Sequence, residues 1–203
     1  MKKIVSLFMR NYDGDHLVRN EVVPGAEWVL AGEGRPTRKW DGTCCMIRDG
    51  KLYKRYDAKT FTVNAATGER IPWGRTPPEG FEPAQDADPI TGHWPGWLPV
   101  GDGKEDRWFR EGFANAPHLH RDGTYELLGP RVNSNPERFP NHVLIPHGDA
   151  ADFEPLGNPR TFDELREFFV AHDMEGIVWW HPDGRMVKIK ARDFGIKRSQ
   201  TKP

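Results

Sequence analysis

The sequence is poor in cysteine, and its cysteines cannot build a covalent framework. Only two occur among 203 residues, and they are the neighbours Cys44 and Cys45. Adjacent residues of a strand point to opposite faces of a sheet, so we expect no disulfide between them. The paired spacing of cysteine and histidine in structural zinc sites is also missing. These absences exclude a disulfide-stapled secreted domain and favour a reducing compartment.

Long hydrophobic runs are missing as well. The apolar run that follows Lys3 ends at Arg10, which is too short for the core of a signal peptide or for crossing a bilayer. No other segment approaches the roughly 18 apolar residues of a membrane span. We therefore expect a soluble, cytoplasmic protein with no membrane partner.

The sequence has almost no excess of charge of either sign. Its 29 lysines and arginines face 30 aspartates and glutamates, which gives a net charge of −1. Binding to nucleic acid through a strong overall field is therefore excluded, and any such contact must come from local basic clusters. Hydrophobic residues make up 36% of the chain. Its length and composition predict one folded domain over residues 1–203.

Two β-hairpins are the plainest elements that the sequence does contain. Residues 43–56 read as two strands around the turn Asp49-Gly50, a pair that favours tight hairpin turns. Residues 176–190 repeat this arrangement around the turn HPDG. Further strand candidates lie at residues 124–130 and 142–147.

A helix is predicted after Thr161, because Thr161 and Glu164 have the spacing of a capping box. An apolar stripe at helical spacing follows, made of Phe162, Leu165, Phe168 and Phe169. A second helix is predicted near residues 105–116. Together the elements predict an α+β fold with mainly antiparallel sheets flanked by a few helices.

Residues 71–100 differ in composition from the rest of the chain. They are dense in proline and glycine and contain Trp73, Trp94 and Trp97. Proline lacks the amide donor that strand ladders and helices use, so we predict an irregular excursion here. The tryptophans predict that it packs onto the domain or onto a ligand.

Four short motifs carry the candidate chemistry. In chain order they are Lys39-Trp-Asp41-Gly42, Tyr125-Glu126-Leu-Leu-Gly129, Glu175-Gly176-Ile-Val178 and Lys188-Ile-Lys190. Taken alone, Lys39 is best explained as a surface lysine. The presence and order of the other three motifs make a functional role the stronger interpretation.

The last two motifs predict a site for a polyphosphate and a divalent metal. Residues two apart in a strand share a face, so Lys188 and Lys190 point the same way while Val187 and Ile189 point into the core. Two ammonium groups on one face repel each other unless an anion lies near them. Glu175 precedes the strand paired with theirs and brings a carboxylate, a group that suits Mg²⁺, to the same region.

These motifs resemble motifs I, III, IV and V of the covalent nucleotidyltransferase superfamily, which contains ATP-dependent DNA and RNA ligases and mRNA capping enzymes. The stretches KWDGTCC, ELLGP, TGHWPGW and EGIVWWHPDGRMVKIK most resemble the short 5′-to-3′ RNA ligases of the vertebrate type. The similarity covers residues 22–197. It implies a nucleotidyltransferase (ligase adenylation) fold and an ATP-dependent RNA ligase.

In that family a lysine attacks the α-phosphate of ATP and forms lysyl-AMP. The AMP then passes to an RNA 5′-phosphate, and a 3′-hydroxyl displaces it to seal the strand. The resemblance makes Lys39 the nucleophile, and Lys188 and Lys190 grip the α-phosphate. Nearby cations favour the neutral amine that a lysine nucleophile requires.

The resemblance also assigns the remaining site residues. Asp41 and Gly42 shape the loop of the nucleophile, and Arg55 contacts phosphate or ribose. Glu126 holds the ribose, and Glu175 binds Mg²⁺ or Mn²⁺ directly or through water. The implied partners are therefore ATP and RNA with 5′-phosphate and 3′-hydroxyl ends, with DNA as the alternative.

The chain departs from parts of the superfamily pattern. Cys44 stands where many DNA ligases and capping enzymes carry an arginine. Only residues 191–203 follow Lys190, so we expect no C-terminal OB domain. Both departures favour RNA ligase. The alternatives are a DNA ligase or other AMP transferase and a non-catalytic nucleotide- or RNA-binding relative, although the latter has no need of a nucleophile.

Simpler explanations stay open for several residues. Lys188 and Lys190 fit an ordinary solvated strand face. Lys54 and Lys59 compete with Arg55 for the phosphate contact.

The histidines are expected mostly to be structural or surface groups. His118 and His120 have the i, i+2 spacing of strand metal ligands but no evident partner cluster. His147 is a candidate for lining the nucleotide pocket.

Overall fold

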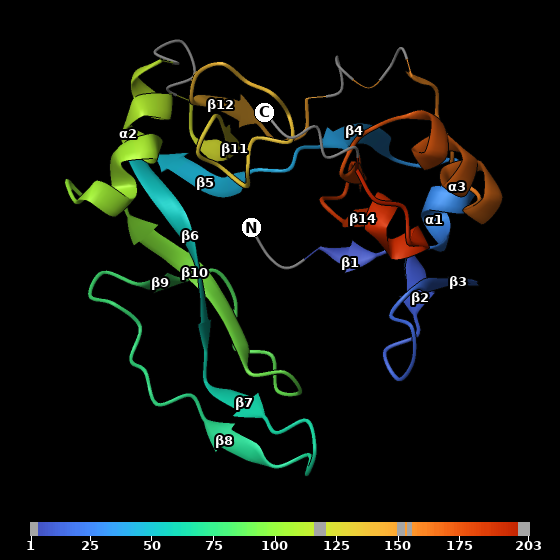
Figure 1. The fold of residues 1–203 in the computed structure, drawn as a ribbon, viewed down its shortest axis with the longest axis horizontal. Coiled ribbons are helices and arrows are strands. Elements are labelled where there is room, and N and C mark those ends of the chain that lie inside the picture. Colours follow the sequence, from blue (N-terminus) through green and yellow to red (C-terminus); the bar gives the residue numbers. More distant parts are fainter. Residues whose placement is uncertain (1–3, 116–120, 150–152, 154–155, 199–203) are drawn as a thin grey trace. The chain divides into compact units, whose positions relative to one another are not determined.

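The computed structural model describes residues 4–115, 121–149, 153 and 156–198 (Figure 1). These residues divide into two compact units. Unit 1 consists of residues 42–147, and unit 2 of residues 4–41 and 148–198. Each has its own hydrophobic core. That the two units together make one domain stays a prediction.

The predicted α+β class with mostly antiparallel sheets is confirmed. Unit 1 contains a six-stranded antiparallel sheet in the order β12-β11-β5-β6-β10-β9. The strands are β5 (Thr43–Arg48), β6 (Lys51–Lys59), β9 (Glu82–Pro83), β10 (His93–Pro99), β11 (Gly123–Leu128) and β12 (Val143–Pro146). The helix α2 (Arg107–Ala114) follows a 3₁₀ turn, η1 (Lys104–Asp106).

The predicted hairpin of β5 and β6 forms around a tight turn. Asp49 and Gly50 have φ values of 50° and 70°, the left-handed conformation that both central residues of a type I′ turn adopt. One face of the sheet is apolar and carries Cys45, Ile47, Tyr125, Leu127 and Leu144, against which Trp108, Phe109 and Phe113 of the α2 region pack. The opposite face is therefore left for polar side chains.

The prediction of an irregular excursion over residues 71–100 is wrong for residues 93–99, which form a regular strand. They form β10, which pairs with residues 53–59 of β6 along its whole length. Pro95 is tolerated because its carbonyl accepts a bond from the amide of Ala84, on the β9 side. The nitrogen and carbonyl of one strand residue face the same neighbour, so the missing donor of Pro95 does not interrupt pairing with β6.

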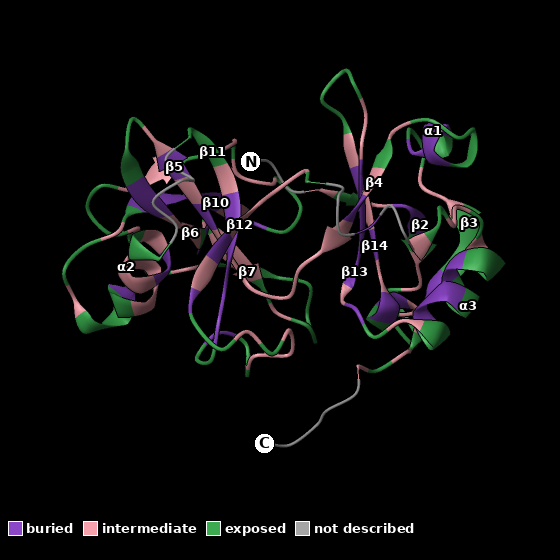
Figure 2. Cartoon of the chain, turned by 90° about the horizontal axis from the view of Figure 1, so that it is seen from above, coloured by how far each residue is buried: buried purple, intermediate pink, exposed green. Residues whose placement is uncertain are grey.

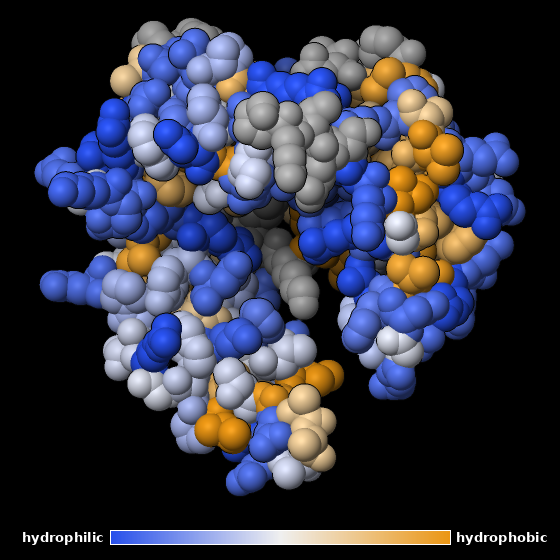
Figure 3. Space-filling view, viewed as in Figure 1, coloured by the Kyte–Doolittle hydropathy of each residue, from blue (hydrophilic) through white to orange (hydrophobic). Residues whose placement is uncertain are grey.

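A small two-stranded sheet extends from unit 1 and is formed by β7 (Phe61–Val63) and β8 (Arg70–Pro72). The Arg70 guanidinium lies 4.6 Å from the centroid of the Phe61 ring. Val63 and Ile71 are exposed, and Figure 3 shows apolar side chains gathered at this end. The ribbon therefore depends on local cross-strand contacts, since it has little core of its own.

Unit 2 contains a four-stranded sheet in the order β1-β14-β13-β4. The strands are β1 (Val5–Ser6), β4 (Arg35–Lys39), β13 (Gly176–Trp180) and β14 (Met186–Lys190). A second pair consists of β2 (Phe8–Arg10) and β3 (Val18–Val22), and the helical elements are α1 (Glu27–Leu30), α3 (Phe162–Ala171) and the 3₁₀ helix η4 (Ala191–Phe194). Among the pairings of described strands, β1 with β14 is the parallel one.

The predicted capping box is confirmed at the start of α3. The Glu164 amide donates to Thr161 Oγ1 at 3.4 Å, and the Thr161 amide donates to Glu164 Oε2 at 3.0 Å. The helix buries Leu165, Phe168 and Phe169 against the strands β13 and β14. Figure 2 shows buried residues along both strands and on one side of α3, with intermediate residues alternating in β14. Because α3 covers one face of the four-stranded sheet, polar side chains lie on the other face.

We predict that Gly176→Ala destabilises unit 2. A Cβ at Gly176 would lie 2.2 Å from the carbonyl oxygen of Ile189 and 3.0 Å from the Cα of Lys190. Both are backbone atoms that move only with the strand, so we expect a loss of about 1–3 kcal/mol in the free energy of unfolding. Chemical denaturation followed by tryptophan fluorescence would measure it.

Gly14→Ala is the matched control in the same unit. Its added Cβ would meet the side-chain amide of Asn11, which can rotate away, so we expect little change. Equal stability of the two variants would contradict the prediction.

Candidate functional site

Three lysines share one face of the four-stranded sheet of unit 2. Gly176 of β13 is the register partner of Lys39 on one side and of Lys190 on the other. Val178, two residues on, is likewise flanked by Lys188. Because directly opposed residues of antiparallel strands share a face, the three ammonium groups gather on the same side. The predicted common face of Lys188 and Lys190 is confirmed.

Lys39 reaches this face on β4, a strand that the sequence pattern does not predict. Thr37 is buried in the middle of the strand, donates its hydroxyl proton to the Val178 carbonyl at 3.1 Å and accepts from the Trp180 indole at 2.9 Å. Pro36 is tolerated because β4 is an edge strand of the sheet. The pairing with β13 therefore places Lys39 at the end of an edge strand.

A single carboxylate, that of Glu175, lies between two of these lysines. Its Oε2 is 2.6 Å from Lys39 Nζ, and its Oε1 is 2.5 Å from Lys190 Nζ. Burial by itself raises the pKa of Glu175, but the two ammonium groups outweigh it and hold the pKa below its ordinary value. The predicted nearness of Glu175 to the lysine pair is confirmed.

Lys188 is held in an unusual electrostatic position. Burial, followed by the charges of Lys190 and Lys39, lowers its pKa to about 8. The pKa of Lys190 is also lowered, first by burial and then by Lys39. Three ammonium groups facing one carboxylate leave an excess of positive charge, and an anion bound there would relieve it.

Asp193 offsets only a small part of this charge, since its effect on the pKa of Lys188 is the smallest of those that shift it. It is buried, forms a salt bridge with Arg10 and accepts a bond from the Lys190 amide at 3.0 Å. This acid therefore fixes the end of β14.

Asp41 has a partner that the sequence analysis did not name. Arg198 Nη1 lies 3.6 Å from Asp41 Oδ2, and Arg198 Nε lies 3.2 Å from Asp173 Oδ1. Arg198, which follows η4, therefore ties the C-terminal part of the chain to Asp41. The only signal in the sequence is the basic character of residues 188–203, which does not identify a single arginine.

In unit 1, Gly42 and Glu126 lie together. The Gly42 amide donates to Glu126 Oε1 at 3.1 Å, and the Asn133 side chain donates to the Gly42 carbonyl at 2.8 Å. A Cβ at Gly42 would meet the Leu127 carbonyl at 2.3 Å, so the close approach requires glycine. His147 Nε2 lies 2.8 Å from Glu126 Oε2, which places this histidine at the same carboxylate.

Arg55 lies on β6 of unit 1, with its Nε 3.1 Å from Asp57 and its guanidinium 5.6 Å from the Trp97 ring. Lys54 forms an ion pair with the buried Asp106. Lys54 is thus held by a structural partner, and the contact of Arg55 with phosphate or ribose stays a prediction. His118 and His120 lie outside the described residues.

The donor chemistry of Glu175 suits the metal that the resemblance implies. Mg²⁺ takes one or two carboxylates and completes its shell with substrate phosphates and water. Glu175 supplies one carboxylate beside the excess of ammonium groups, although both of its oxygens are engaged by lysines. Each of these oxygens has a second lone pair, so the carboxylate can also bind a metal ion or a metal-bound water.

The chain is similar to RNA ligases, both in a match to a family model and in matches to individual proteins. Residues 116–202 match the family model for RNA ligase 1. The chain is 26% identical to RNA ligase 1 of Pongo abelii, 28% to that of Rattus norvegicus and 27% to that of Danio rerio, in each case over 79% of this chain and 67% of the relative. The resemblance to vertebrate-type RNA ligases is confirmed, and the chain spans about two thirds of their length. No helix among the described residues could cross a membrane.

The lowered pKa of Lys188 can be tested directly. We expect one lysine of ¹³C-labelled protein to titrate with a midpoint of about 8, and we expect this signal to disappear in Lys188→Arg. Adding sulfate should move the midpoint upward, because a bound anion stabilises the charged ammonium. Nuclear magnetic resonance of the lysine side chains would follow the titration.

Lys51→Arg is the control, since Lys51 is exposed on the turn side of β6. It should leave the low midpoint in place. Titration of every lysine in the ordinary range would overturn the electrostatic account of the site.

Proposed function

We propose that this chain is an ATP-dependent RNA ligase that joins 5′-phosphate and 3′-hydroxyl ends through a lysyl-AMP intermediate. The observation that carries the proposal is the placement of Lys39 beside Lys188, Lys190 and Glu175 on one sheet face. A nucleophile, two further cations and one carboxylate are the groups that nucleotidyl transfer needs. Similarity to proteins named RNA ligase 1 supports it independently.

In the first step, Lys39 Nζ forms a bond to the α-phosphorus of ATP. The bond to the pyrophosphate oxygen breaks, pyrophosphate leaves, and the nitrogen loses a proton. Lys188 and Lys190 contribute positive charge where negative charge develops on the phosphate oxygens. Their pKa values are lowered first by burial and then by the neighbouring lysines, and a bound triphosphate would relieve the repulsion among these charges.

Glu175 has two roles in this proposal. It holds Lys39 and Lys190 in place through its two oxygens. When ATP is bound, the phosphates would take over contacts to the ammonium groups, and Glu175 would hold Mg²⁺ or Mn²⁺ directly or through water. The metal supplies charge neutralisation of the pyrophosphate leaving group.

The remaining predicted residues contribute binding. Glu126 holds the ribose hydroxyls, and its contact with the Gly42 amide orients the carboxylate. Asp41 shapes the loop together with Gly42, and its ion pair with Arg198 supports that role. Arg55 contacts phosphate or ribose.

In the second step the AMP passes from Lys39 to the 5′-phosphate of RNA, and in the third a 3′-hydroxyl displaces AMP and seals the strand. RNA is favoured over DNA because the relatives are named RNA ligase 1. A DNA ligase or another AMP transferase is the alternative. We place the reaction in the cytoplasm, in agreement with the reducing compartment that two cysteines without a disulfide favour.

The first step predicts a covalent label on the protein. Incubation with α-³²P-ATP and Mg²⁺ should give an acid-labile radioactive band on a denaturing gel, and Lys39→Ala should abolish it because no amine is left to attack. Lys51→Ala, at an exposed position, should label like the wild type. A chase with 5′-phosphorylated RNA or nicked DNA then identifies the acceptor.

Two outcomes would contradict this proposal. One is a wild-type protein that stays unlabelled with Mg²⁺ and with Mn²⁺, even after pyrophosphate treatment has removed any AMP already bound. The other is a band that persists in Lys39→Ala. Release of label to DNA but not to RNA would replace RNA ligase by the DNA alternative.

A further inference from the structure

The polar face of the unit 1 sheet gathers three side chains of different chemistry. Cys44 on β5 lies directly opposite Glu126 on β11, and Glu126 lies opposite Ile145 on β12. His147 is two residues beyond Ile145 and donates its amide to the Thr124 carbonyl at 3.0 Å. Residues two apart share a face, so the side chains of Cys44, Glu126 and His147 point to the same side of the sheet.

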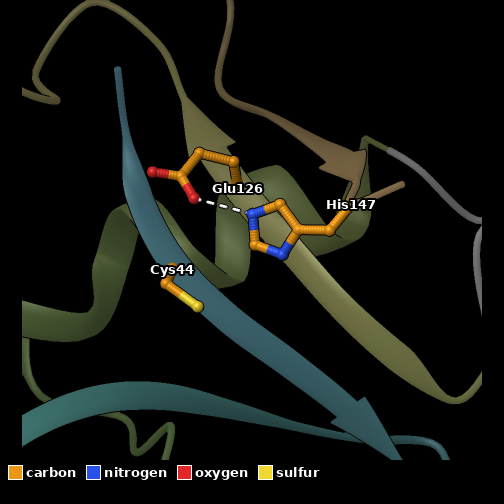
Figure 4. A group of neighbouring side chains, drawn as sticks. All are labelled: Cys44, Glu126 and His147. Carbon is orange, nitrogen blue, oxygen red and sulfur yellow. Dashed lines mark hydrogen bonds and ion pairs between the residues drawn. The ribbon is translucent and has the colours of Figure 1, made fainter. Parts of the chain in front are cut away.

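These three side chains are close enough to share one ion. The cysteine sulfur, a carboxylate oxygen and an imidazole nitrogen all lie within 4.8 Å of one another (Figure 4), and Glu126 is buried. Ligand atoms around a tetrahedral zinc lie roughly 3–4 Å apart, given bonds of about 2.0–2.3 Å. Small rotations of the side chains would therefore gather them around a metal.

His147 already faces the carboxylate of Glu126 with one nitrogen. Its Nε2 lies 2.8 Å from Glu126 Oε2, while its Nδ1 is buried and has no hydrogen-bond partner among the described residues. An ion held by both side chains would take the place of the contact between Nε2 and Glu126, and Nδ1 would then carry the proton of the neutral imidazole. The two side chains are therefore positioned so that a metal can bind where the hydrogen bond now lies.

We propose that Cys44, Glu126 and His147 form a binding site for Zn²⁺ or a metal of similar softness, distinct from the Glu175 region of unit 2. A thiolate and an imidazole select zinc, cobalt or nickel over magnesium and calcium, which prefer oxygen ligands. Three protein ligands leave a fourth position of the tetrahedron open. Binding releases the thiol proton of Cys44 and replaces the contact of Glu126 with His147.

Zinc at this site would regulate the ligase. If Glu126 holds the ribose of ATP, an ion that draws this carboxylate toward Cys44 competes with the nucleotide. This consequence rests on the proposed function, but the metal site does not. Zinc should then inhibit AMP labelling of Lys39 at concentrations at which it binds the protein.

Cobalt provides a direct test, since Co²⁺ replaces Zn²⁺ and reports its ligands by colour. We expect one equivalent of Co²⁺ to produce a sulfur-to-cobalt charge-transfer band in the near ultraviolet, which added Zn²⁺ removes. Cys44→Ala should abolish the band, and His147→Ala should weaken Co²⁺ binding about 10-fold or more. Absence of the band in the wild type would overturn the site.

Cys45→Ala is the matched control, because Cys45 is the neighbouring thiol on the opposite, buried face. Its side chain faces the core and not the proposed ligands, so the band should survive its removal. A band lost equally in both cysteine variants would contradict the proposal.

Alkylation tests the same site in the unmutated protein, so a variant that fails to fold cannot decide the outcome. Iodoacetamide should modify Cys44 in the metal-free protein, and Zn²⁺ should protect it, as read by peptide mass spectrometry. Unchanged modification in zinc would overturn the site. Cobalt binding without AMP labelling would preserve the metal site and refute the proposed function, whereas labelling without cobalt binding would do the reverse.

Discussion

The contact that organises unit 2 is the bridge of Glu175 between Lys39 and Lys190. A carboxylate with an ammonium group on each oxygen holds the ends of two strands that lie on opposite sides of β13. It needs Gly176 next to it, because the backbone of β14 leaves no room for a Cβ there. Lys188 lies on the same face, where burial and the charges of Lys190 and Lys39 lower its pKa to about 8. The three ammonium groups around one carboxylate thus favour binding of an anion at this face.

Side chains alternate between the two faces of a β-strand, so in both units neighbouring residues of one strand serve the core and the candidate site in turn. In β14, Val187 and Ile189 enter the core while the intervening lysines face the site. In β5, Cys45 enters the core and Cys44 joins Glu126 and His147 on the polar face. Two identical neighbouring residues therefore have different environments, because the pleat alone decides which side each one faces.

The similarity to RNA ligase 1 and the structure support each other at different residues. The family match covers residues 116–202, which include Glu126, Glu175 and both lysines of β14 but not Lys39. The ion pair with Glu175 links Lys39 to that matched region in space. The proposed nucleophile is thus supported by its contacts as well as by its motif.

The sequence by itself determined the hairpins, the capped helix, the common face of Lys188 and Lys190 and the nearness of Glu175, since each follows from local periodicity or turn chemistry. The tertiary structure decided the rest. The strand β4 has the polar sequence RPTRK and becomes a strand only by pairing with β13. Residues 93–99 form β10 despite two prolines, because pairing with β6 holds the strand along its whole length. The amide that Pro95 lacks would face β9 and not β6. The contacts of Arg198 and the grouping of Cys44, Glu126 and His147 join residues far apart in the chain, and such contacts leave no local pattern in a single sequence.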